Sequence, residues 1–250
     1  MRYFVWISFD GTAYHGWQIQ PNGMSVQERL QQSLSTLLRQ PVEVIGAGRT
    51  DAGVHARQMA AHFDIDRDLD CQQLAYRLNR ILPKDISCNG VQRVSDDVHA
   101  RFSATRRTYR YYIHTRRDPF ARHYSVLMNW PLDFQRMNEA AALLLTVDDF
   151  KAFCKANADN KTTLCHVSKA KWVQTSDSTY YFEIAANRFL RNMVRAVVGT
   201  LVDVGRHTIS MDQFETIVRR GNRSDAGQSM PAHGLFLWQI EYDDTSAPTI

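Results

Sequence analysis

The sequence has little of what several protein classes require. Only four of its 250 residues are cysteine, and no two of them form a C-x-x-C pair. A disulfide framework or a zinc knuckle is therefore not expected, and we interpret the four as free, buried thiols. No apolar run reaches the roughly 18 residues that a membrane-spanning helix needs, and the N-terminus alternates like a strand instead of resembling a signal peptide. We expect a cytoplasmic protein with no membrane partner.

Clear sequence repeats and low-complexity linkers are also absent. The hydrophobic share of 44% is enough for a full core in a chain of this length. Strand-like and helix-like periodicities occur in both halves of the chain, so the fold class that we expect is α+β. It consists of two related α/β halves (ferredoxin/RNP-like), with mixed, mostly antiparallel sheets joined side by side around a basic cleft. The expected domains are residues 1–105 and 106–250.

The periodicities predict the elements of each half. Ser25 and Glu28 have the spacing of a helix N-terminal capping box, and Pro83 ends a second amphipathic segment. Strands show apolar residues at every second position. Predicted helices cover 25–39, 71–82 and 133–145, with two more starting at Phe189 and Met211. Predicted strands cover 3–10, 42–50, 59–65, 106–114, 167–175, 179–186 and 235–243.

Positive charge is concentrated between residues 101 and 125. This segment holds seven arginines and one acidic residue, which leaves a net −2 for the rest of a chain whose total is +4. In a strand over 106–114, Arg106 and Arg110 would share one face, and Tyr109 would lie on the more apolar one. Arginines interleaved with tyrosines are typical of surfaces that neutralise phosphates and stack bases. The alternatives are a solvated face for the arginines and a core position for Tyr109.

A second basic element is predicted in the helix that starts near residue 189. At about 100° per residue, Arg188, Arg191 and Arg195 would fall within about 60° of one another, away from the apolar stripe. Together with the arginines at 101–125, they indicate an RNA-binding surface. A solvated helix face is the alternative.

The stretch "GAGRTDAGVHAR" at residues 46–57 is the candidate reactive site. In an extended segment Arg49 and Asp51 project to the same side, so the guanidinium can keep the carboxylate ionised and oriented. Gly48, Ala52 and Gly53 leave space for a substrate to approach. The alternative is a structural turn with an ion-paired aspartate.

Two other functions were weighed against an enzyme acting on RNA. A non-catalytic RNA-binding protein would explain the basic segment but not the Arg-Thr-Asp loop. A metal-dependent hydrolase using Asp51, His55 and His62 is disfavoured because no H-E-x-x-H motif or tight His/Cys cluster accompanies them. We therefore expect no metal and interpret His55 as a residue that orders the loop.

Six stretches form an ordered set of motifs along nearly the whole chain. They are "DGTAYHGWQIQP", "SVQERLQQSL", "GAGRTDAGVHA", "DDVHARFSATRRTYRYYI", "NRFLRNMVRAVVGTLVDVG" and "MPAHGLFLWQIEY". Through these stretches the chain resembles the TruA family of tRNA pseudouridine synthases. The chain departs from the family pattern at Gln58 and Met59 and in "NKTTLCHV", where local RNA contacts are expected to differ.

The resemblance implies a role for each matching residue. Asp51 falls on the catalytic nucleophile, and Tyr109 on the tyrosine that stacks against the target base. Arg49 and Arg195 fall on arginines that contact the nucleophile or the target nucleotide. The implied activity is isomerisation of uridine to pseudouridine at positions 38 to 40 of tRNA, in the anticodon arm. The implied enzyme is a homodimer that needs no cofactor.

Overall fold

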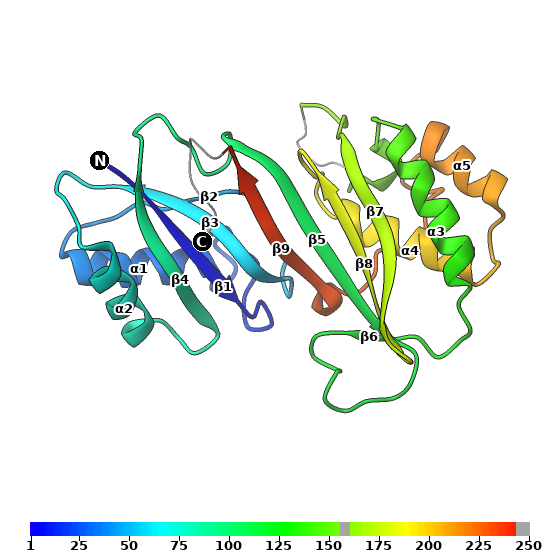
Figure 1. Ribbon diagram of the computed structural model, residues 1–250, viewed down its shortest axis with the longest axis horizontal. Coiled ribbons are helices and arrows are strands. Elements are labelled where there is room, and N and C mark those ends of the chain that lie inside the picture. Colours follow the sequence, from blue (N-terminus) through cyan, green and yellow to red (C-terminus); the bar gives the residue numbers. More distant parts are fainter. Residues whose placement is uncertain (156–160, 244–250) are drawn as a thin grey trace. The chain divides into compact units, whose positions relative to one another are not determined.

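The computed structural model describes residues 1–155 and 161–243, which form two compact units. The first unit comprises Met1–Arg107 and the chain from Phe236 on, and the second comprises Thr108–Leu235 (Figure 1). The last strand thus belongs with the N-terminal elements, whereas the sequence assigned all of 106–250 to a second half. Helices and mostly antiparallel strands occur in both units, which confirms the predicted α+β class.

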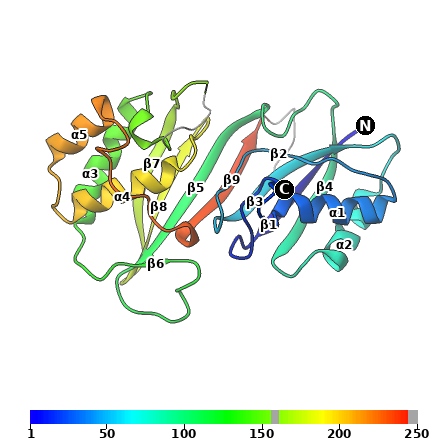
Figure 2. The same ribbon diagram turned by 180° about the vertical axis from the view of Figure 1, so that it is seen from behind.

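The first unit is built on strands in the order β4-β1-β3-β9, with the short β2 paired to β3. β1 runs antiparallel to both of its neighbours, and β3 is parallel to β9. Two helices lie on one face of these strands, in front of them in Figure 2. The elements are β1 (Arg2–Phe9), α1 (Val26–Leu38), β2 (Ile45–Gly46), β3 (His55–Asp64), α2 (Cys71–Ile81), β4 (Ile86–Val94) and β9 (Leu235–Tyr242).

Strand β1 is buried on both faces. Its residues Tyr3 to Ile7 are at most 1% exposed, so the alternation expected of a strand with one wet face does not apply. On one face, Phe4 and Trp6 pack edge-on against Tyr242 of β9, with ring centroids 5.3 and 5.7 Å apart. This aromatic layer joins β1 to β9, two strands far apart in the sequence.

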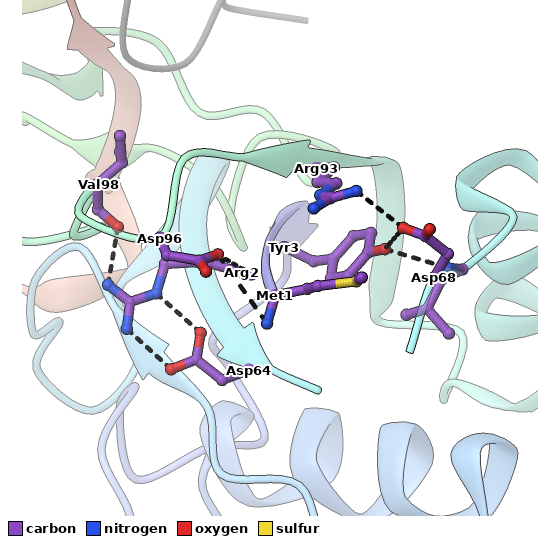
Figure 3. Close-up of polar contacts among 9 residues, drawn as sticks. Met1, Arg2, Tyr3, Asp64, Asp68, Arg93, Asp96 and Val98 are labelled. Carbon is purple, nitrogen blue, oxygen red and sulfur yellow. Dashed lines mark hydrogen bonds and ion pairs between the residues drawn. The ribbon is translucent and has the colours of Figure 1, made fainter. Parts of the chain in front are cut away.

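The outer end of β1 is fixed by an ionic network (Figure 3). The Arg2 guanidinium donates to both Asp64 carboxylate oxygens at 2.9 and 2.8 Å and to the Val98 carbonyl at 3.1 Å. The Arg2 amide donates to Asp96 at 2.9 Å. The hydrogen bond from Arg2 outweighs partial burial and lowers the pKa of Asp64. One arginine thus ties β1, the end of β3 and the segment after β4 together.

His62 lies under the segment that follows β4. It is 1% exposed, and its Nδ1 accepts a hydrogen bond from the Ala100 amide at 3.1 Å. Within the described residues, its buried Nε2 has no hydrogen-bond partner. Burial, and then the positive charge of Arg2, lower the pKa of His62 to about 4. The folded protein therefore holds this imidazole neutral.

The buried His62 predicts a loss of stability in acid. The unfolded chain takes up the proton near pH 6.5, whereas the folded protein resists it down to about pH 4. The contribution is fully present above pH 6.5 and is lost as the pH falls toward 4, by about 3 kcal/mol. Urea unfolding of wild type and His62→Gln between pH 7 and 4 tests this. We expect the shallower decline in the variant, and parallel curves would contradict the prediction.

The second unit has strands in the order β5-β8-β7, with β6 parallel to β5. Helix α3 packs against α4, α5 and β7. The elements are β5 (Ala104–His114), β6 (Val126–Leu127), α3 (Phe134–Leu143), η1 (Leu144–Thr146), η2 (Lys151–Phe153), β7 (Val167–Ser176), β8 (Thr179–Ala186), α4 (Met193–Gly205), α5 (Met211–Arg220) and η3 (Ala232–Gly234). β5 begins in the first unit and continues into the second.

Two predicted elements differ from the structure. The strand expected over 42–50 is reduced to β2, because side chains of α1 bind two of its amides: Ser35 Oγ accepts from Val42 and Gln31 Oε1 from Val44. The helix expected from Phe189 begins at Met193. Asn192, which precedes it, has a left-handed backbone (φ 66°), and its side-chain amide donates to Ser229 Oγ. That conformation cannot continue a right-handed helix.

Two expectations from the sequence concern the cysteines and membrane-spanning helices. Cys88 and Cys165 are buried, as expected, but Cys71 and Cys154 are partly exposed, so the expectation of four buried thiols is wrong for these two. No helix within 1–155 and 161–243 combines the length and apolar character needed to cross a bilayer.

Candidate active site

The candidate loop joins β2 to β3 and is bound to the segment that follows β1. The Trp17 amide donates to the Thr50 carbonyl at 3.3 Å, and the Gly53 amide donates to the Tyr14 carbonyl at 3.4 Å. The Tyr14 hydroxyl is in turn bound to Asp85 at 2.7 Å. Main-chain bonds therefore hold the loop on both sides of Asp51.

Glycines allow this close approach of two backbones. A Cβ on Gly16 would lie 2.3 Å from the Thr50 carbonyl oxygen, and its φ of +89° is in the region that glycine favours. A Cβ on Gly11 would lie 2.0 Å from the Val54 carbonyl oxygen. At Gly48, in contrast, a Cβ would meet nothing within 4 Å. Glycine thus serves the packing of the loop at two positions and leaves it open at a third.

His55, which the sequence predicts to order the loop, comes directly after it in the chain. It is buried at the start of β3, and its Nδ1 accepts from the Gly11 amide at 3.1 Å. One Asp10 carboxylate oxygen lies 3.0 Å from the same nitrogen, and the ring stacks on Phe236 of β9 at 4.6 Å. The imidazole thus contacts residues at the ends of β1 and β9, and its role in ordering the loop stays a prediction.

Asp51 and Arg49 lie in this loop with different exposure. Asp51 is half-buried and Arg49 is exposed, while Thr50 between them is buried. The Asp51 carbonyl accepts from the Val54 amide at 3.1 Å, which closes a tight turn after the carboxylate. The predicted ion pair between Arg49 and Asp51 stays a prediction.

Tyr109 lies on β5 in the second unit and is half-buried. Its ring meets Phe189 edge-on, with centroids 5.0 Å apart and planes at 84°. The next residues on the same side of β5, Tyr111 and Ile113, are fully buried, as the strand periodicity predicted. Sequence reasoning missed Phe189, although it lies inside a quoted motif, because a partner 80 positions away leaves no local signal.

Arg195 lies in the first turn of α4. Its Nε donates to the Met230 carbonyl at 2.6 Å, and the Met230 amide donates back to the Arg195 carbonyl at 3.1 Å. The segment before Met230 lies close to the helix, since a Cβ on Gly199 would be 1.9 Å from the Gln228 carbonyl oxygen. This segment fixes the direction of the Arg195 side chain, and no pattern in the sequence predicts that contact.

Two of the predicted RNA-binding arginines hold carboxylates. Arg106 binds Glu241 at 2.7 Å, and Arg110 binds Glu183 at 2.5 Å. Burial alone would raise the pKa of Glu183, but hydrogen bonds from Lys169 and Arg110 outweigh it and lower that pKa. Arg106 therefore contributes to the fold of the first unit, and Arg110 contributes to the fold of the second.

Arg188 and Arg191 do not share a helix face with Arg195, so that prediction is wrong. Both precede α4 because the helix starts only after Asn192. Arg188 Nη1 lies 3.4 Å from the Thr162 carbonyl, and Arg191 is exposed. The three arginines come from a turn and a helix, and their predicted contact with RNA is not tested by this arrangement.

Comparison with known proteins matches the chain to one family. A family described as "tRNA pseudouridine synthase" matches residues 5–103 and 140–243, which include Asp51 and Arg195 but not Tyr109. The chain is 54% identical over 242 residues to tRNA pseudouridine synthase A of Bacteroides fragilis, covering 96% of both chains. It is 37% identical to the protein of that name from Bacillus subtilis over 248 residues, covering 98% of this chain and 100% of the relative.

Proposed function

This chain belongs to the tRNA pseudouridine synthase family, and on that premise we propose that it converts uridine to pseudouridine at positions 38 to 40 of tRNA, with Asp51 as the nucleophile. The activity is that of an isomerase acting on tRNA. The observation that carries the proposal is the half-buried Asp51 carboxylate, on a loop pinned on both sides by main-chain bonds and open at Gly48. We also propose a cytoplasmic homodimer.

The reaction itself needs few groups. The bond between N1 of uracil and C1′ of ribose breaks, the base turns, and a bond between C5 and C1′ forms. The proton that C5 loses balances the one that N1 gains, so no oxidant, reductant or second substrate enters, and we propose that no cofactor takes part. The enzyme must stabilise charge during cleavage and retain the detached base, which a fixed carboxylate in a dry pocket can do.

The remaining residues are proposed to hold the substrate. Tyr109 receives the face of the flipped base, because a base inside the arm is out of reach of a carboxylate. Arg49 and Arg195 orient the Asp51 carboxylate or bind the target nucleotide. Arg106, Arg110, Arg188 and Arg191 are proposed to bind RNA. Arg106 and Arg110 would do so while each also donates to a carboxylate of its own unit.

The test is to map pseudouridine in bulk tRNA from cells with and without the gene. We expect tRNA from cells without the gene to lose pseudouridine at positions 38 to 40 only. Expression of the wild-type protein should restore it, and the purified protein should form it in unmodified tRNA. Unchanged tRNA, or loss at other positions, would refute the assignment. Binding without turnover by the purified protein would favour a non-catalytic RNA-binding protein instead.

Substitution of Tyr109 separates stacking from proton transfer. Tyr109→Ala loses the stacking face, which is worth about 1–3 kcal/mol per base, and should lower kcat/KM by about 5- to 150-fold. Tyr109→Phe keeps the face and the edge-on contact with Phe189. Its activity should exceed that of the alanine variant, and the size of its loss reports what the hydroxyl contributes. Wild-type kcat/KM in Tyr109→Ala would remove this residue from the site.

A further inference from the structure

The loop between β5 and β6, residues 115–125, extends away from the strands of the second unit (Figures 1 and 2). Its two ends are fixed. The Thr115 amide donates to the Ser178 carbonyl at 2.8 Å, and the Met128 amide donates to the His114 carbonyl at 2.8 Å. The buried His114 Nδ1 and Ser125 Oγ are 2.9 Å apart. The loop is therefore a projection with a rigid base.

The tip of this loop presents aromatic rings to solvent. Phe120 is 90% exposed and Tyr124 is 45% exposed. Two turns set their positions, since the Phe120 amide donates to Asp118 Oδ1 at 2.8 Å and the Tyr124 amide donates to the Ala121 carbonyl at 3.0 Å. These two rings on an ordered backbone offer apolar faces on which a partner could stack.

The charge around Phe120 indicates the chemistry of that partner. Arg116, Arg117 and Arg122 are all exposed, and Asp118 is the one acidic residue of the loop. Arginines bind the phosphates of a nucleic acid, and an exposed aromatic ring can stack on an unpaired base. RNA with an unpaired base is therefore the partner that this loop fits. Self-association of two copies through this loop is disfavoured, because it would bring the arginines of one loop against those of the other.

The loop lies apart from the proposed stacking residue. Tyr109 is five residues from His114 along β5, which at about 3.3 Å per residue is roughly 17 Å. Because the loop extends from this far end of β5 and away from the strands, we expect Tyr109 and Phe120 to stack on different bases.

We propose that residues 115–125 form a second RNA-docking element. Phe120 stacks on an unpaired base several nucleotides from the target uridine, and Arg116, Arg117 and Arg122 bind the flanking phosphates. The inference rests on the proposed function in taking tRNA as the bound RNA. It adds a contact that lies outside the family match, which leaves out residues 104–139.

The experiment measures the affinity for unmodified tRNA as a function of salt. Phe120→Ala should weaken binding by about 5- to 150-fold. Arg116→Ala/Arg117→Ala should reduce the slope of log affinity against log salt by about two. In turnover assays, the loop variants should show a raised KM for tRNA and a kcat near that of wild type.

The exposed face of α2 supplies matched controls. Tyr76 is 62% exposed, and Arg77 and Arg80 are exposed near it. Tyr76→Ala and Arg77→Ala/Arg80→Ala remove the same kinds of group and should bind tRNA like wild type.

Three outcomes would overturn the inference. The first is unchanged tRNA affinity in the loop variants, and the second is an equal loss of tRNA affinity in the α2 control variants. The third is a changed oligomeric state of the loop variants in sedimentation while their tRNA affinity is unchanged, which would assign the loop to contact with a second copy of the chain. Failure of the proposed function looks different. In that case wild type binds tRNA without forming pseudouridine, and the loop variants still bind more weakly.

Discussion

Replacing Asp51 with asparagine is expected to lower pseudouridine formation by about three orders of magnitude or more. Asparagine keeps the size of the side chain and removes the negative charge, so neither attack nor charge stabilisation by the carboxylate remains. The loop is held through the main chain of Thr50, Gly53 and Val54, and these bonds do not involve the Asp51 side chain. Fold and tRNA affinity should therefore stay near wild type.

Single-turnover assays with saturating enzyme isolate this chemical step from binding. Asp66→Asn is a suitable control, because Asp66 is an exposed carboxylate between β3 and α2 of the same unit. Thermal unfolding and tRNA affinity are measured on both variants. Near-wild-type turnover by Asp51→Asn would show that Asp51 is not the nucleophile.

The second large effect is expected at Arg195. Arg195→Ala should reduce the single-turnover rate by about 10²- to 10³-fold, the usual cost of losing a preorganised charged donor. The Met230 carbonyl holds Nε, so the guanidinium has a set direction, which a flexible ammonium cannot reproduce. Arg195→Lys should therefore recover part of the binding but little of the rate.

Rate and affinity measured together decide whether Arg195 acts on the reaction or only on RNA. Arg219→Ala is the matched control, since Arg219 pairs with Glu215 on the exposed side of α5. If Arg195→Ala weakens tRNA binding and leaves the rate at saturation unchanged, Arg195 is a phosphate contact and not a positioning residue.

Local patterns in the sequence were enough to predict most helices and strands. Ser25 caps α1 with a bond to the Glu28 amide, and α2 ends before Pro83. The errors arose where distant residues decide the local conformation. Asn192 is drawn toward Ser229, 37 positions away, and Gln31 takes the Val44 amide that a longer β2 would have paired.

In the candidate loop too, features set by the local sequence could be predicted and features set by distant residues could not. Its small residues and single carboxylate were visible in the sequence. The reason for the glycines was not, because Gly16 and Gly11 meet the backbone of residues 34 and 43 positions ahead. Likewise, the carboxylates that hold Arg106 and Arg110 lie 135 and 73 positions away. A count of charges cannot distinguish an arginine that meets RNA from one that pairs within the fold.

The return of β9 to the first unit affects the order in which the protein can fold as it is synthesised. Every strand of the second unit has left the ribosome before β9 is complete. Until then Phe4 and Trp6 lack the Tyr242 ring, and His55 lacks Phe236. Domains usually mature in the order of their synthesis. Here the unit that carries Asp51 is begun before the second unit and gains β9 only after it. A nascent chain should therefore not complete the packing around His55 before β9 is made.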